Sequence, residues 1–126
     1  MTLPLAVTPG DPAGIGPDLL LATVANGTAP GLVAFADSAL LARRAEELGL
    51  DVPLRAWQPG APLPAEGLAV AEVPLATAAT AGQPDPANSP ALLAALDRAM
   101  AAIREGICAG LVTGPLSKAV IAGGTD

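Results

Sequence analysis

The chain has 126 residues, about the length of a single domain, and is 52% hydrophobic but only 2% aromatic, so any core must be built from aliphatic side chains. Twelve acidic residues against six basic ones give a net charge of −6, which excludes the basic face that nucleic-acid binding requires. The sequence has no histidine, and this excludes a Ser-His-Asp triad and every histidine-based metal site from these residues.

Cysteine use and the amino-terminal residues indicate a cytoplasmic protein. The single cysteine, Cys108, cannot form an internal disulfide, which is typical of a reducing compartment. Residues 1–4 lack the basic region of a signal peptide. No apolar run approaches the roughly 18 residues of a membrane helix. We therefore expect a soluble, acidic domain that handles a small molecule and binds neither nucleic acid nor membrane.

The first element is a short apolar run at residues 3–8, which predicts a buried strand. A loop rich in glycine and proline follows at residues 11–17. A helix is then expected with Pro17 in its first turn and with residues 26–27 (Asn-Gly) at its end.

A second strand and helix follow in the same order. Residues 31–36 form another apolar run, and Asp37 or Ser38 can cap a helix that reaches residue 47 or 48 before Gly49 ends it. This alternation of strand and helix favours an α/β fold with a parallel-rich sheet and crossover helices.

The middle of the chain is less regular. Residues 52–57 and 68–73 are candidate strands, joined by a loop that contains three prolines. Residues 76–90 are mostly small, also with three prolines, and predict a surface loop.

The clearest helix begins at Ser89 and Pro90, with the serine as its cap, and ends at Gly106. Five large residues predict one apolar stripe along it: Leu92, Leu93, Leu96, Met100 and Ile103.

The last elements lie beyond Gly106. Residues 107–113 predict a further buried strand, in which Cys108 is a small core residue rather than a nucleophile. The chain turns at residues 114–115, and a final helix is expected from about Leu116 to residues 123–124.

Two segments share one geometry, a buried strand followed by a glycine- and proline-containing loop and a helix start. In an open parallel sheet, ligands bind outside the carboxyl ends of strands, so both loops would lie at the ligand-binding edge. The first segment is TPGDPAGIGP at residues 8–17. Its glycines allow close backbone approach, and free helix N–H groups can hold an anion. The spacing of its glycines matches neither the Rossmann nor the Walker pattern. The alternative to a ligand-binding loop is a tight turn that needs glycine for its dihedral angles.

The second segment is TGPLSK at residues 113–118, and it contains Lys118, the only lysine of the chain. In the first turn of a helix a cation opposes the helix dipole by roughly 0.3–1 kcal/mol. A lysine directed at a bound phosphate or carboxylate would explain this placement. The alternative is a solvated lysine at an ordinary helix start.

Other polar residues have simpler interpretations. Asp37 lies 21 residues after Gly16, near the offset of a Rossmann ribose-binding acid, but the stronger interpretation is a helix N-cap. The paired charges at residues 43–44 and 46–47 are interpreted as the solvated face of one helix.

Together, TPGDPAGIGPD at residues 8–18 and VTGPLSK at residues 112–118 resemble the 4-hydroxythreonine-4-phosphate dehydrogenase family of vitamin B6 biosynthesis. Residues 35–37 (Phe-Ala-Asp) and 80–82 (Thr-Ala-Gly) also fit that pattern. The first motif further resembles the G-D-G-I-G-P segment of isocitrate and isopropylmalate dehydrogenases. The resemblance therefore implies an isocitrate/isopropylmalate dehydrogenase-like fold that is incomplete in this chain.

The resemblance implies that residues 1–126 are the N-terminal α/β portion of a longer dehydrogenase. Members of the family are more than twice as long, and their substrate-binding G-H-T-E segment and three metal-binding histidines would lie beyond this sequence. The implied reaction is NAD- or NADP-dependent oxidation of 4-phosphooxy-threonine with a divalent metal, followed by decarboxylation. A homodimer is implied as well, and the 126 residues alone are expected to be inactive, with no metal ligand among them.

Seven candidate site residues follow from loop position together with the resemblance. Those expected to shape the cofactor or active-site edge are Gly10, Asp11, Gly14, Ile15 and Gly16, and those expected to contact the substrate or its phosphate are Thr113 and Lys118.

Two alternatives remain open. A related dehydrogenase could act on a cis-dihydrodiol carboxylate or a sugar-acid phosphate, because the residues that would select the substrate lie outside the chain. An inert fragment could serve only as a packing or interaction module. If the chain is only part of a longer protein, we expect apolar surface to be exposed and to favour association.

Overall fold

The computed structural model describes residues 3–27, 31–80, 82–83 and 85–114. The elements in chain order are β1 (Leu5–Thr8), α1 (Gly16–Ala25), β2 (Leu32–Ala36), α2 (Ser38–Leu48), β3 (Leu54–Ala56), β4 (Leu68–Glu72), a 3₁₀ turn (Pro86–Asn88), α3 (Ser89–Arg104) and β5 (Gly110–Thr113).

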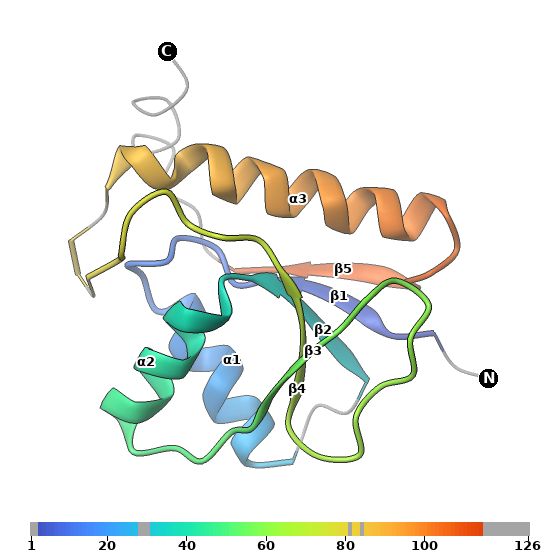
Figure 1. The fold of residues 1–126 in the computed structure, drawn as a ribbon, viewed down its shortest axis with the longest axis horizontal. Coiled ribbons are helices and arrows are strands. Elements are labelled where there is room, and N and C mark those ends of the chain that lie inside the picture. Colours follow the sequence, from blue (N-terminus) through green and yellow to red (C-terminus); the bar gives the residue numbers. More distant parts are fainter. Residues whose placement is uncertain (1–2, 28–30, 81, 84, 115–126) are drawn as a thin grey trace.

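The five strands form one parallel sheet in the order β3-β4-β2-β1-β5. Helices α1 and α2 lie on one side of the sheet and α3 lies on the other (Figure 1). The predicted parallel α/β fold with crossover helices is confirmed. All the strands point toward the same edge, so the loops after β1 and β5 come together at their carboxyl ends.

The two helices on the first face are joined by an ion pair that the sequence did not reveal. Arg44 is 6% exposed, and its Nε donates to Asp18 Oδ1 at 2.8 Å, with a second bond from Nη2 to Oδ2. The hydrogen bonds that Arg44 donates to the Asp18 carboxylate raise the pKa of Arg44 above its ordinary value. The predicted solvated face was therefore wrong for Arg44, because its guanidinium bridges α2 to α1.

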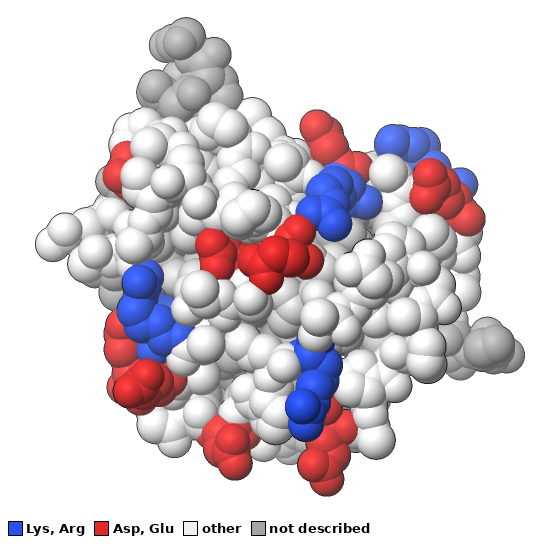
Figure 2. All heavy atoms as spheres, viewed as in Figure 1, with Lys and Arg blue, Asp and Glu red and all other residues white. Residues whose placement is uncertain are grey.

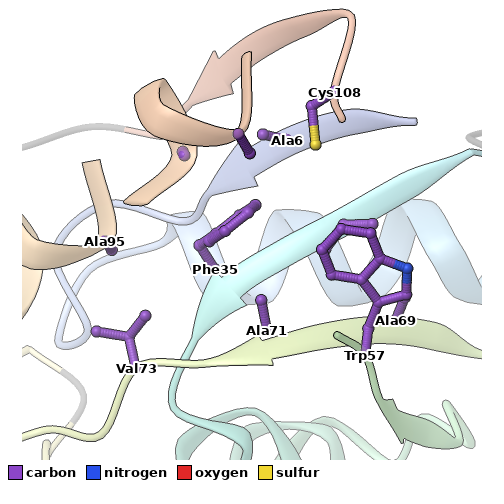
Figure 3. Close-up of a cluster of buried hydrophobic side chains, with 11 residues drawn as sticks. Ala6, Phe35, Trp57, Ala69, Ala71, Val73, Ala95 and Cys108 are labelled. Carbon is purple, nitrogen blue, oxygen red and sulfur yellow. The ribbon is translucent and has the colours of Figure 1, made fainter. Parts of the chain in front are cut away.

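The core between α3 and the sheet is made mostly of alanines around two aromatic rings (Figure 3). Phe35 and Trp57 pack edge to face, with ring centroids 6.4 Å apart. Because these rings fill the space between the sheet and α3, the helix presents small alanine side chains to them. Its buried alanines are Ala95, Ala99 and Ala102.

The predicted apolar stripe of α3 is only partly directed at the core. Of its five residues only Leu92 is buried, and Met100 is 42% exposed. Ile103 is partly buried and packs against the core cluster, and Leu93 and Leu96 are half-buried, so alanines occupy most of the fully buried positions of the helix.

The start of α3 also differs from the prediction. Asn88 is the N-cap and Ser89 is the first helical residue, because the 3₁₀ turn runs directly into the helix. The Asn88 side chain makes no capping bond, and its Oδ1 instead accepts a hydrogen bond from the N–H of Thr77 at 3.0 Å.

Cys108 lies in the turn before β5, not inside the strand as predicted. Its N–H donates to the Ala102 carbonyl at 3.1 Å and so helps to close the end of α3. The thiol is 2% exposed, and burial raises its pKa above the ordinary value. The expectation of a small core residue is confirmed.

Strand β5 is less buried than predicted, because it forms an edge of the sheet in the part of the chain that the structure describes. Val112 in this strand is 50% exposed, and Leu19 of α1 is 56% exposed. The expected exposure of apolar surface is confirmed at these positions.

Charged side chains are dispersed over the molecular face shown in Figure 2, with uncharged surface between them. This face shows no concentrated basic patch. Within the described ranges, no helix is both long and apolar enough to span a membrane.

The alanine face of α3 makes a stability prediction. Ala99 is fully buried against the sheet, so Ala99→Leu should overpack this layer and lower the free energy of unfolding by about 1–3 kcal/mol. The exposed neighbour Met100→Leu should change it by less than about 0.5 kcal/mol. Urea denaturation measures both, and equal effects of the two substitutions would contradict the packing described.

The exposed edge of the sheet makes a second prediction. An uncharged edge strand can pair with another chain, so the 126-residue chain should self-associate, and Val112→Lys should reduce this association. Sedimentation velocity at several concentrations measures it. A monomer at all concentrations for the unsubstituted chain would be the contradicting result.

Candidate functional site at the carboxyl edge of β1 and β5

The two motif loops meet at one edge of the sheet. Strands β1 and β5 are neighbours, with Thr8 in register with Thr113. Directly after the pair, the N–H of Gly114 donates to the Thr8 carbonyl at 2.7 Å. Segments about a hundred residues apart in the sequence are therefore joined by a backbone hydrogen bond (Figure 1).

Gly114 allows this close approach because it has no side chain. A Cβ at this position would lie 2.1 Å from the carbonyl oxygen of Pro9, far inside any real contact. Glycine in the second motif is thus required by the backbone of the first motif.

The first loop is shaped from within by Asp11. The residue is 8% exposed, and its Oδ1 accepts from the N–H of Ala13 at 2.9 Å, while its carbonyl accepts from the N–H of Gly14 at 2.9 Å. Gly10 has a φ of 87°, a conformation that favours glycine. The Asp11 carboxylate therefore holds the turn, and any contribution to ligand binding acts through the shape of the loop.

Helix α1 begins at the end of this loop. Its N-cap, Ile15, is 62% exposed and provides no side-chain cap, and Gly16 is the buried first residue. Without a side-chain cap from Ile15, N–H groups of the first turn are the kind that solvent or a ligand can bond. Pro17 and Asp18 stand in the first turn as predicted.

A groove of about 410 Å³ runs between α1 and the ends of β1 and β5. Pro9 and Gly16 from the first motif line it together with Thr113 and Gly114 from the second, and Leu19 and Val112 add apolar walls. A separate cavity on the α3 side, bounded in part by residues 8–10, measures only about 30 Å³. That volume suits a water molecule rather than a substrate, so the groove on the α1 side is the candidate site.

The two residues predicted to contact substrate differ in what the structure shows. Thr113 ends β5, is exposed, and its hydroxyl donates to the Gly114 carbonyl at 3.1 Å. Lys118 lies outside the described residues, as does the helix predicted from Leu116 to residues 123–124.

Asp37 serves as a helix cap. Its Oδ1 accepts from the N–H groups of Ala39 and Leu40 at 2.8 and 3.2 Å. Its Oδ2 accepts from the N–H of Leu75 at 2.8 Å. Both carboxylate oxygens thus have backbone partners, which supports the N-cap interpretation over the ribose-binding alternative.

The segment that precedes α3 also reaches the site, a position that the sequence did not predict. The N–H of Gly82 donates to the Ala13 carbonyl at 2.8 Å, so this segment touches the first motif loop directly. The only signal in the sequence was the family-like Thr-Ala-Gly at residues 80–82, of which Ala81 lies outside the described residues.

A divalent metal does not fit the described part of the chain. Residues 3–27, 31–80, 82–83 and 85–114 contain no group of three or more His, Cys, Asp or Glu side chains that could hold one. The whole sequence also lacks histidine.

Comparison with protein families adds independent information. Residues 28–125 match the model of the family described as pyridoxal phosphate biosynthetic protein PdxA. A 4-hydroxythreonine-4-phosphate dehydrogenase from Stutzerimonas stutzeri (strain A1501) is 50% identical over 123 residues, which cover 94% of this chain and 37% of the relative.

Solved structures agree. A 4-hydroxythreonine-4-phosphate dehydrogenase from Klebsiella pneumoniae superposes with a TM-score of 0.89 at 25% identity, covering 98% of this chain and 40% of that one. A terephthalate 1,2-cis-dihydrodiol dehydrogenase from Burkholderia xenovorans LB400 superposes with a TM-score of 0.77 at 25% identity, covering 100% and 38%. The chain thus spans little more than a third of the length of these proteins.

The contact between the two motif loops makes a prediction. Gly114→Ala should force β5 away from the Pro9 carbonyl and lower the free energy of unfolding by about 1–3 kcal/mol. The control is Gly110→Ala at the start of β5, where the new Cβ would meet only Leu5 Cδ2 at 3.5 Å, an ordinary contact. Urea denaturation compares them, and an unchanged stability for Gly114→Ala would refute the close approach.

Proposed function

Because the chain belongs to the PdxA family of pyridoxal phosphate biosynthetic proteins, we propose that it is the part of an NAD(P)-dependent dehydrogenase that begins the active-site cleft for 4-hydroxythreonine 4-phosphate. Residues 1–126 would form an N-terminal α/β portion of that enzyme. The observation that carries the proposal is the hydrogen bond from Gly114 to Thr8, which unites the two family-like loops at one sheet edge.

The two loops have different proposed roles. The first loop, with its uncapped helix start and its close-packed backbone, would shape the nicotinamide cofactor edge through Gly10, Asp11, Gly14, Ile15 and Gly16. The second would contact the substrate through Thr113 and Lys118. A lysine suits this role because its ammonium is a point charge that can pair with a phosphate or carboxylate.

When bound, the nicotinamide would supply the hydride acceptor for oxidation of the substrate alcohol. The residues of this chain would bind and orient. The divalent metal implied by the family resemblance has no ligand set among the described residues, so none of them is assigned to it.

The complete enzyme is proposed to be a cytoplasmic homodimer that takes a phosphorylated hydroxy acid. The relatives' names specify such a substrate for those proteins. The single, buried thiol of Cys108 is in keeping with a reducing compartment.

A second candidate keeps the reaction type and changes the substrate. The structural similarity to the terephthalate cis-dihydrodiol dehydrogenase favours a cis-dihydrodiol carboxylate. A lysine at position 118 could pair with the carboxylate of that substrate as well as with a phosphate.

The test uses two chimeric enzymes. The 126 residues are joined to the following part of the Stutzerimonas stutzeri relative in one, and to the following part of the Burkholderia xenovorans protein in the other. NAD reduction is measured with each protein's own substrate, and with the 126-residue chain alone as a control. We expect turnover of 4-hydroxythreonine 4-phosphate by the first chimera, none by the chain alone, and little by the second chimera. Activity restricted to the second chimera would favour the cis-dihydrodiol function, and inactivity of both would refute the proposal.

The role of Lys118 is tested in the first chimera. Loss of a charged hydrogen bond to the substrate should make Lys118→Ala raise the KM for the phosphorylated substrate by about tenfold or more. Arg104→Ala serves as the matched control, because Arg104 is an exposed cation in the last turn of α3. Unchanged KM and kcat for Lys118→Ala would rule out the contact.

A further inference from the structure

The connecting segment between β4 and α3 (residues 73–88, of which 81 and 84 lie outside the described residues) reaches the first motif loop from a distance along the chain. Its regular structure in the described part consists of one bridge between Thr80 and Gln83 and the 3₁₀ turn at Pro86–Asn88. Val73 at its start packs in the core and Ala79 is buried, but most of its other side chains are small and exposed. Beyond Val73, its polar contacts with neighbouring elements therefore contribute strongly to its position.

Two of these contacts come from the amino-terminal half of α2. The second carboxylate oxygen of Asp37 accepts from the N–H of Leu75 at 2.8 Å. One and a half turns further on, Arg43 Nη2 donates to the carbonyl of Ala79. A space of about 250 Å³ remains between α2 and residues 75–79, so these two bonds bridge a gap that side chains do not fill.

On its other side the connecting segment holds the first motif loop. The N–H of Gly82 donates to the Ala13 carbonyl. Gly82 lies three residues after Ala79, the residue that Arg43 contacts. The N–H of the same Ala13 donates to Asp11. The Ala13 backbone is therefore fixed from inside the loop by Asp11 and from outside it by Gly82.

The exposed ion pair with Glu47 does not explain why Arg43 lies against the connecting segment. Its Nε lies 3.8 Å from Glu47 Oε1, with the two side chains 41% and 51% exposed. A pair at that exposure contributes little to stability. The bond to Ala79, in contrast, joins positions 36 residues apart in the sequence.

We propose that Asp37 and Arg43 are positioning residues for the glycine loop, acting through the connecting segment. The bonds from Asp37 and Arg43 fix the position of residues 75–79, and the Gly82 bond in turn fixes Ala13. The loop at residues 10–16, which forms the proposed cofactor edge, therefore depends on both bonds. This inference rests on the proposed function, because it assigns the loop a bound nicotinamide cofactor.

Two substitutions break the anchors one at a time. Asp37→Asn keeps an oxygen to cap α2, since asparagine is among the best N-caps, but it directs an amide N–H₂ at the Leu75 N–H, which opposes two donors. Arg43→Gln removes the guanidinium. Arg43→Lys should recover part of the effect, because an ammonium can still donate to the Ala79 carbonyl. Glu47→Gln is the matched control, since it removes the exposed ion pair and leaves the Ala79 bond.

The variants are made in the first chimera and measured in two ways. Hydrogen exchange of the peptide that contains Gly82 should be faster in Asp37→Asn and Arg43→Gln, intermediate in Arg43→Lys and unchanged in Glu47→Gln. The KM for NAD should rise by about three- to tenfold in the first two variants with kcat little changed, because each loses one hydrogen bond that holds the loop.

Two results would overturn the inference. Unchanged exchange at Gly82 would show that the anchors do not hold the segment. Faster exchange with an unchanged KM for NAD would show that the segment does not set the cofactor edge. Failure of the proposed function appears differently, as a lack of turnover by the unsubstituted chimera.

Discussion

The parallel pairing of β1 with β5 is the constraint on which the candidate site depends. It brings Gly114 so close to the Pro9 carbonyl that only a glycine can stand there. The same pairing places a glycine-rich loop and the start of a second motif around one groove. The candidate site at this edge therefore depends on a backbone contact formed between the two ends of the described fold.

The rest of the molecule supports that edge from both sides. Helix α3 connects β4 to β5 across a core layer made mostly of alanines, and β5 pairs with β1. On the other face, the Arg44–Asp18 pair joins α2 to the first turn of α1, at the end of the glycine loop. Polar bonds from α2 and its N-cap reach Leu75 and Ala79, and Gly82 of the same connecting segment bonds to Ala13. The loop is thus held by both its own strand and a neighbouring helix.

Local signals predicted the elements well. Helix α2 begins after Asp37 and ends at Gly49 as expected. An N-cap carboxylate and a left-handed C-cap glycine contact only backbone groups a few residues away, so the sequence is enough to predict them. Features that arise from tertiary packing could not be predicted. The buried face of α3 is made mostly of alanines rather than leucines, Arg44 is buried, and Gly82 bonds to Ala13, since each of these features depends on what lies across the sheet or loop. The two motifs were identified from sequence, but the bond that joins them required the structure.

The central claim is that the two motif loops form one ligand site. A crystal structure of the first chimera with NAD and substrate bound tests it most directly. We predict that residues 10–16 contact the cofactor while Thr113 and Lys118 contact the substrate in the same cleft, with the Gly114–Thr8 hydrogen bond retained. Cofactor and substrate bound away from either loop would contradict the account.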